Sequence, residues 1–100
     1  MSHGLTPDTV TRLHGVLARF PAIEKALLYG SRARGNHKPG SDIDLTLCGR
    51  SLTSEQLAVI ASELDDLLLP YTLDLSILDR LDHADLRQII AREGVVFYER

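Results

Sequence analysis

The chain has 100 residues, of which 44% are hydrophobic and 25% are charged, and its formal net charge is −3. These values are typical of a soluble protein, and we expect residues 1–100 to form a single domain. The negative net charge argues against direct binding to nucleic acid, which needs clustered Lys and Arg. No apolar run is long enough to span a membrane and no signal-peptide pattern opens the chain, so we expect a cytoplasmic protein without membrane contact. The single Cys48 can form no internal disulfide, which agrees with that location.

The first part of the chain predicts one helix and one strand. Residues 1–5 carry no periodic pattern, and we expect them to be loose. Residues 6–8 read Thr-Pro-Asp, which is typical of a helix start, and we expect that helix to stop at Pro21. The apolar residues 23–29 then predict a central strand.

Glycine and proline punctuate the next part. Residues 30–34 predict a turn with at most one turn of helix, and residues 36–40 predict a loop with a break at Pro39 and Gly40. Residues 41–48 predict the second strand.

The remainder predicts a helix, a strand, a helix and a strand. Thr53 and Gln56 form a capping box, which opens a helix that Pro70 ends. Residues 71–78 alternate as a third strand, with Thr72, Asp74 and Ser76 on its polar face. Asp82 and Asp85 open the last helix, Gly94 is a candidate C-cap, and residues 95–98 form a short final strand. This order predicts an α/β domain with two layers and a mixed sheet.

Residues 27–47 carry the chemistry that the sequence suggests. Asp42 and Asp44 are two residues apart on the second strand and therefore share one face of the sheet. Two such carboxylates can converge on a hard cation such as Mg²⁺, which usually comes with phosphates. Gly30 allows a backbone to approach a ligand closely, and Ser31 offers a hydroxyl beside it. A short helix that begins at Ser31 would point free N–H groups at an anion, so these residues predict a nucleotide-handling site.

A known family shares this pattern. Gly30-Ser31, followed after ten residues by Asp42-Ile43-Asp44, resembles the GS-x10-D-x-D signature of the DNA polymerase β-like nucleotidyltransferases. The fuller pattern GSRARG…SDIDL resembles the minimal nucleotidyltransferase (MNT) branch, many of whose members are antitoxins encoded beside a HEPN-domain ribonuclease toxin. The resemblance implies a polymerase-beta-like palm that transfers AMP from ATP to a tyrosine of the HEPN toxin and so silences it.

The resemblance also implies roles for particular residues. Asp42 and Asp44 would hold two Mg²⁺ ions, and Asp74 matches a third carboxylate that serves the attacking hydroxyl. Gly30, Ser31 and Arg34 would bind the nucleotide.

Simpler interpretations exist for the same residues. Asp42 and Asp44 could lie on a solvent-facing strand, and Asp74 on a solvated sheet face. Arg32 and Arg34 could be surface charges. We expect three further residues of the motif region to have no chemical role: His37 and Lys38 as solvated residues at a loop tip, and Tyr29 as a packing residue.

The pattern also leaves more than one function open. No segment for binding an acceptor follows the palm, so we expect a second protein to supply the acceptor, and residues 67–69, Leu-Leu-Leu, are a candidate contact. One alternative is an antitoxin that inhibits by binding only. The other is the catalytic subunit of a small-molecule nucleotidyltransferase whose acceptor domain is a separate protein.

Overall fold

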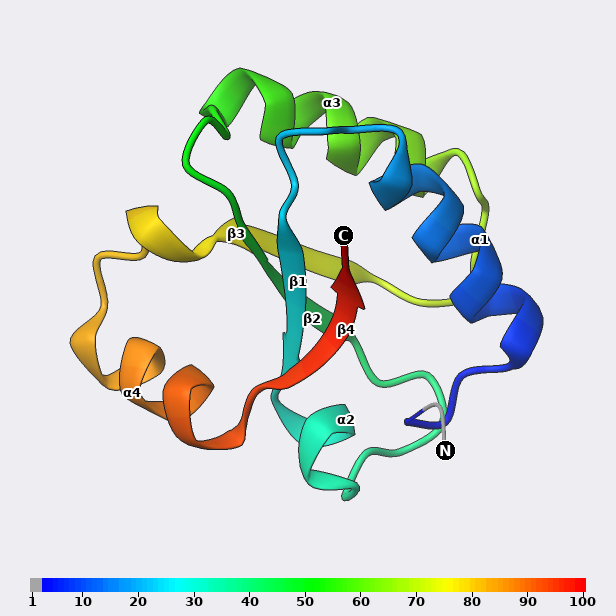
Figure 1. Ribbon diagram of the computed structural model, residues 1–100. Coiled ribbons are helices and arrows are strands. Elements are labelled where there is room, and N and C mark those ends of the chain that lie inside the picture. The colour runs from blue at the N-terminus through cyan, green and yellow to red at the C-terminus, as the bar shows by residue number, and fades with distance from the viewer. Residues whose placement is uncertain (1–2) are drawn as a thin grey trace.

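The computed structural model, which describes residues 3–100, contains one four-stranded sheet with helices on both faces (Figure 1). In chain order the elements are α1 (Pro7–Ala18), β1 (Lys25–Tyr29), α2 (Ser31–Arg34), β2 (Ile43–Cys48), α3 (Ser54–Asp65), β3 (Leu73–Ile77), the 3₁₀ turn η1 (Leu78–Arg80), α4 (Ala84–Glu93) and β4 (Val95–Glu99). The strand order is β3-β2-β1-β4, in which β1 is antiparallel to both of its neighbours and β2 is parallel to β3. The prediction of an α/β domain with a mixed sheet is therefore confirmed.

The alternating apolar residues of β2 point to the face that α1 and α3 cover. Ile43, Leu45 and Leu47 of β2 are completely buried there. They form one cluster with the buried stripes of the two helices, which consist of Leu13, Val16, Leu17, Ile60 and Leu64. The alternation of apolar and polar residues in β2 therefore places its apolar side chains in the main core, as the sequence predicted.

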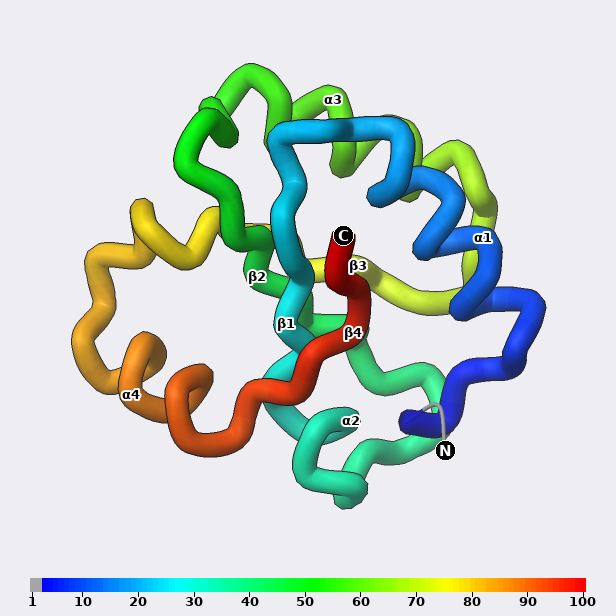
Figure 2. Tube along the Cα trace, in the orientation of Figure 1, coloured from blue at the N-terminus to red at the C-terminus, as the bar shows by residue number. Residues whose placement is uncertain are grey.

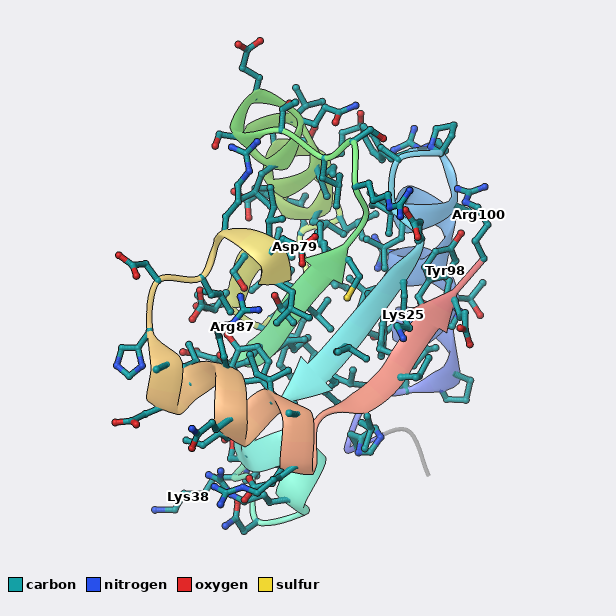
Figure 3. The ribbon with its side chains drawn as sticks, turned by 60° about the vertical axis from the view of Figure 1, so that its left-hand side comes forward. Lys25, Lys38, Asp79, Arg87, Tyr98 and Arg100 are labelled. Carbon is teal, nitrogen blue, oxygen red and sulfur yellow. The ribbon has the colours of Figure 1, made fainter. Side chains whose placement is uncertain are left out.

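The opposite face of the sheet is only partly covered. Helix α4 crosses it (Figure 3) and leaves a hollow of about 340 Å³, which Leu27 and Leu78 line together with four residues of α4, Ile90 among them. The end of the sheet where β1 finishes and β2 begins lies beside α2 (Figure 1). None of the helices within residues 3–100 is long and apolar enough to cross a membrane.

The helix starts that the sequence predicted are present. The Thr6 side chain accepts a hydrogen bond from the amide of Thr9 at the start of α1. Thr53 and Gln56 form the reciprocal capping box of α3, at 3.1 and 3.2 Å. In α4 the N-cap is His83, whose Nδ1 accepts from Leu86, so a histidine and not an aspartate provides the cap.

The prediction that the third helix continues to Pro70 is wrong. Helix α3 ends at Asp65, and Leu68 lies beyond it with a φ of 54° and 87% of its surface exposed. Proline has no N–H, and its ring clashes with the carbonyl four residues earlier, so Pro70 prevents helix well before its own position.

The expectation of a loose N-terminus is also wrong for residues 3–5, while Met1 and Ser2 lie outside the described residues. Leu5 is 5% exposed and belongs to the main core. It occupies the position before the N-cap Thr6, and Val10 occupies the fourth helical position, which are the two positions of a hydrophobic staple. The chain before α1 then runs beside the loop that follows α2 (Figure 2), where His3 Nδ1 is bonded to the carbonyl of Arg32 at 3.1 Å.

Candidate active site

Acidic residues from neighbouring strands meet at the end of the sheet that lies beside α2. In the register of the sheet, Tyr29 is opposite Asp44, and Asp44 is beside Asp74. Side chains at paired positions lie on the same face, so these three residues form a row across β1, β2 and β3. Asp42 is two residues before Asp44 and directly precedes β2. The structure thus brings the three predicted carboxylates to one corner of the sheet.

Burial separates these acids from their apolar neighbours. Ile43 and Leu45 are fully buried on the core face, whereas Asp44 is half-buried and Asp42 and Asp74 are exposed. Burial raises the pKa of Asp44, and the negative charges of Asp74 and Asp42 raise it further, while Arg34 lowers it. Asp44 is therefore a carboxylate that is crowded by two others, which is the kind of donor set that a divalent cation stabilises.

Mg²⁺ fits this donor set only in part. Within residues 3–100, no three His, Cys, Asp or Glu side chains lie close enough together to hold a metal ion on their own. Protein-bound Mg²⁺ usually takes one or two carboxylates and completes its shell with water and substrate phosphates. The acids at this corner are suited to a shared ligand set of that kind.

Gly30 is required at its position for two reasons. Its φ of 80° lies in the left-handed region that favours glycine. A Cβ atom built on Gly30 would also overlap the Oδ2 atom of Asp44. The Asp44 carboxylate thus lies directly against the backbone of residue 30, in space that any other residue would fill.

The short helix predicted at Ser31 is confirmed. Helix α2 begins at Ser31, and its first intrahelical bond runs from the Arg34 amide to the Gly30 carbonyl at 3.1 Å. The first amides of a helix have no acceptor within that helix. Gly30 is the N-cap directly before these amides, and its backbone lies against the Asp44 carboxylate.

Arg34 lies within electrostatic reach of this corner. Its Nη1 atom is 3.3 Å from Oε1 of Glu93 in α4, in an ion pair whose two side chains are 45% and 36% exposed. Its positive charge also lowers the pKa of Asp44. An exposed ion pair of this kind is weak and easily exchanged for another anion.

Arg32 is not a surface charge, so that interpretation is wrong. Its side chain is 1% exposed and is held by backbone carbonyls on two other segments, at Ser41 and His3. The signal that the sequence offered was only its place in the motif, because no local pattern predicts that a charged side chain will be buried against distant carbonyls.

The two residues expected at a solvated loop tip behave differently. Lys38 is exposed and projects from the molecule (Figure 3). His37 is half-buried, with its ring against Gly4, and its buried Nδ1 has no hydrogen-bond partner in the part of the chain that the structure describes. With Arg32 and Tyr71 it lines a hollow of about 290 Å³.

Tyr29 was expected only to pack, but it lies beside the acids of the candidate site. It is 7% exposed, and it lies on the row of acids and not in the main core cluster. Burial raises its pKa, the charge of Asp74 raises it further, the Ser76 hydroxyl lowers it, and Asp44 adds a smaller increase. Tyr29 therefore keeps its hydroxyl proton beside the two carboxylates. The position of Tyr29 directly before Gly30, at the end of a strand, was the signal that could have identified it.

A hydroxyl pair supports the strands one row further along. Ser76 donates a hydrogen bond to Thr46 Oγ1 at 2.9 Å, and Thr46 is completely buried although it is on the polar face of β2. This bond ties β2 to β3 beneath Asp44 and Asp74, so the relative position of the two acids depends on the sheet and not on a loop.

Comparison with known proteins gives a family. The sequence model of the family described as "Polymerase beta, Nucleotidyltransferase" matches residues 12–100. This range includes every residue of the corner described above. No curated protein is similar enough in sequence to match the chain.

Several solved structures share the fold. A chain of a toxin–antitoxin crystal structure with AMP-PNP is similar with a TM-score of 0.74 and 22% identity, over 91% of this chain and 73% of that chain. A complex of a tri-AMPylated Shewanella oneidensis HEPN toxin with an MNT antitoxin has a TM-score of 0.70 and 19% identity, over 100% of this chain and 74% of the other. The MntA–HepT toxin–antitoxin structure has a TM-score of 0.70 and 18% identity, over 95% and 74%. These likenesses confirm the predicted polymerase-beta-like fold.

Proposed function

The chain belongs to the polymerase beta nucleotidyltransferase family, and on that premise we propose that it transfers AMP from ATP to a tyrosine of a partner HEPN-domain protein. In this role it acts as an antitoxin of the MNT type. The observation that carries the proposal is the placement of Asp44 against the backbone of Gly30 and beside Asp74. A phosphate-binding turn and a pair of carboxylates then meet where a nucleotide would react.

Each residue at the corner has a part in the proposed reaction. The amides of α2, which begins at Ser31, bind phosphate oxygens, and Arg34 leaves Glu93 to add a charge-assisted contact. Asp42, Asp44 and Asp74 would hold the magnesium ions together with water and the phosphates of ATP. When bound, Mg²⁺ supplies charge neutralisation for the triphosphate and lowers the pKa of the attacking hydroxyl.

The group transfer has a simple balance. The tyrosine oxygen of the partner forms a bond to the α-phosphorus of ATP while the bond from that phosphorus to the bridging oxygen breaks, and pyrophosphate leaves. Asp74, which is exposed and at the edge of the sheet, receives the hydroxyl proton. An exposed acid at an edge strand is accessible to a tyrosine that another protein presents.

Docking of a second protein supplies the acceptor and holds it near the nucleotide. The three solved structures named above are all described as toxin–antitoxin structures, and one contains a tri-AMPylated HEPN toxin, which supports a partner of that class. Leu68, with 87% of its surface exposed, is a candidate contact for the partner.

Mixing the two proteins tests the proposal. The purified chain is incubated with Mg²⁺, ATP and the HEPN protein encoded beside it, and the masses of both proteins are measured together with ribonuclease activity. We expect one or more AMP-sized increments on the HEPN protein and a matching loss of its activity. Inhibition at equal molar ratio without ATP and without a mass change would favour inhibition by binding only. Transfer of AMP to a small molecule, with the HEPN protein unmodified, would favour the small-molecule enzyme.

A further inference from the structure

Arg32 is a buried charge with every guanidinium nitrogen paired. Its Nε and Nη2 atoms donate to the carbonyl oxygen of Ser41 at 3.1 and 2.8 Å, and Nη1 donates to the carbonyl of His3 at 2.9 Å. The guanidinium carbon also lies 4.8 Å from the ring centroid of Tyr71, which is a favourable cation–π distance. Burying a charge is costly unless its polar groups are paired in this way, so the arrangement needs a structural reason.

The Ser41 carbonyl belongs to the peptide that joins Ser41 to Asp42. The two bonds from Arg32 therefore fix the backbone directly before Asp42. Directly after it, the amide of Ile43 donates to the carbonyl of Thr72 at 2.9 Å. Asp42 thus has an exposed side chain on a backbone that is held on both sides.

The loop before Asp42 is closed by a local turn, in which the Ser41 amide donates to the Lys38 carbonyl at 3.0 Å and the Lys38 amide donates to Ser41 Oγ at 2.8 Å, but these two bonds stay within the loop. Between α2 and Ser41 the residues are mostly exposed, and Gly35 and Gly40 have φ values of 80° and 82°. Glycine loses more conformational freedom on folding than any other residue, so a loop of this kind adopts one conformation only when something anchors it. The guanidinium of Arg32 provides that anchor, because it bonds to the last residue of the loop.

We infer that Arg32 is a positioning residue, which fixes the peptide between Ser41 and Asp42 and so places the Asp42 carboxylate relative to Ser31 and Asp74. Arg32 is the second residue of α2, so the helix that would meet the phosphate also carries the anchor for the acid. The Arg32 guanidinium also lies over the ring of Tyr71, which directly precedes Thr72, the residue whose carbonyl accepts from Ile43. Arg32 therefore also contacts the chain just before β3. The inference rests on the proposed function only because it assigns Asp42 to the metal ligands.

Arginine suits this position better than lysine. A planar guanidinium presents several donors in a fixed fork and stacks on an aromatic ring, whereas an ammonium is a compact charge on a flexible stem. Lysine at residue 32 keeps the charge but cannot bond to Ser41 and His3 at once while its charged group lies flat on Tyr71. Arg32→Lys is therefore a test of geometry at constant charge.

Hydrogen exchange measured by mass spectrometry on the segment of residues 36–44 tests the inference without any reaction. A hydrogen bond to a charged group contributes about 1.5–3 kcal/mol to stability, and the lysine variant loses at least one such bond. We therefore expect amide exchange in residues 36–44 of folded Arg32→Lys to be about tenfold faster or more. Arg50→Lys is the matched control, because Arg50 is exposed and follows the other end of β2. Exchange in this segment should be unchanged in the control. Unchanged exchange in folded Arg32→Lys would overturn the inference.

A second variant covers the case in which Arg32→Lys fails to fold. Tyr71→Leu keeps Arg32 and its hydrogen bonds but removes the ring from beside the guanidinium. We expect a smaller acceleration of exchange in the same residues, and unchanged exchange in Tyr71→Leu would then count against the inference. Mn²⁺ titrated into the protein with a non-hydrolysable ATP analogue gives a further readout. We expect Arg32→Lys to weaken Mn²⁺ binding while the analogue's affinity measured without metal stays the same. Faster exchange in a protein whose wild type transfers no AMP would uphold the positioning role and reject the proposed function.

Discussion

The Asp44 carboxylate packs directly against the backbone of Gly30, so closely that a Cβ atom on residue 30 would overlap it. Gly30 directly follows the last residue of β1, and Asp44 is the second residue of β2. The antiparallel pairing of these two strands brings the residues together. The turn that would bind phosphate and the acid that would bind metal are therefore one structural unit. Changes at either residue should affect the other.

Gly30→Val tests this unit through nucleotide binding. The substitution places a branched side chain where φ is 80° and where the Asp44 carboxylate lies, so both the turn and the acid must shift. We expect the affinity for ATP with Mg²⁺, measured by calorimetry, to fall sharply, while thermal stability falls less. Gly15→Ala is the control: Gly15 is inside α1 with open space around its Cα, and alanine there should stabilise the helix by about 0.5–1 kcal/mol. Wild-type ATP affinity in Gly30→Val would count against the phosphate role.

Asp44→Asn should change the pH dependence of stability. The pKa of Asp44 is raised in the folded protein, so its ionised form disfavours folding, and this penalty is absent below its ordinary pKa and develops as pH rises through the raised value. With divalent cations chelated, we expect Asp44→Asn to melt at a higher temperature than wild type at pH 7, and the difference should shrink toward pH 4.

Asp65→Asn is the matched control for that measurement. Asp65 is an exposed acid at the end of α3, and surface substitutions of this kind usually change stability by no more than about 0.5 kcal/mol. Melting temperatures of Asp44→Asn that equal wild type at every pH would contradict the raised pKa that burial and the neighbouring acids give Asp44.

Leu68→Asn should separate stability from partner contact. Leu68 has a φ of 54°, a conformation that costs a leucine about 1–2 kcal/mol and that asparagine tolerates. We expect the free energy of unfolding to rise by up to about 1 kcal/mol and the affinity for the HEPN protein to fall. Val59→Asn changes another exposed apolar residue, in the regular helix α3, and should not stabilise the fold. Unchanged partner affinity in Leu68→Asn would remove Leu68 from the interface.

The alternation in β2 and the spacing of the signature were enough to predict the corner of the sheet. Asp42, Asp44 and Gly30 could be placed because a strand has a period of two and because glycine has a specific use at a turn. Asp74 followed from the same alternation in β3, and the register places it beside Asp44.

Other features depended on contacts between distant parts of the chain. Arg32 donates hydrogen bonds to the carbonyls of Ser41 and His3, which are 9 and 29 residues away in the chain. No local sequence pattern predicts that a distant backbone carbonyl will be the partner of a buried charge. Leu5 looked like part of a loose terminus because a single apolar residue has no period. The early end of α3 was within reach of sequence reasoning, since Pro70 excludes helix in the residues before it.

The rate of AMP transfer from α-labelled ATP to the HEPN protein, compared between wild type and Asp42→Asn/Asp44→Asn, tests the central claim most directly. The double variant keeps the volume of both side chains but removes the charge that would bind metal. We expect a folded protein whose transfer rate is lower by more than the roughly 10²–10³-fold typical of one lost electrostatic stabiliser. Asp65→Asn/Asp66→Asn, which changes two exposed acids at the end of α3, should transfer at the wild-type rate. Full transfer by Asp42→Asn/Asp44→Asn would contradict the assignment of this corner as the active site.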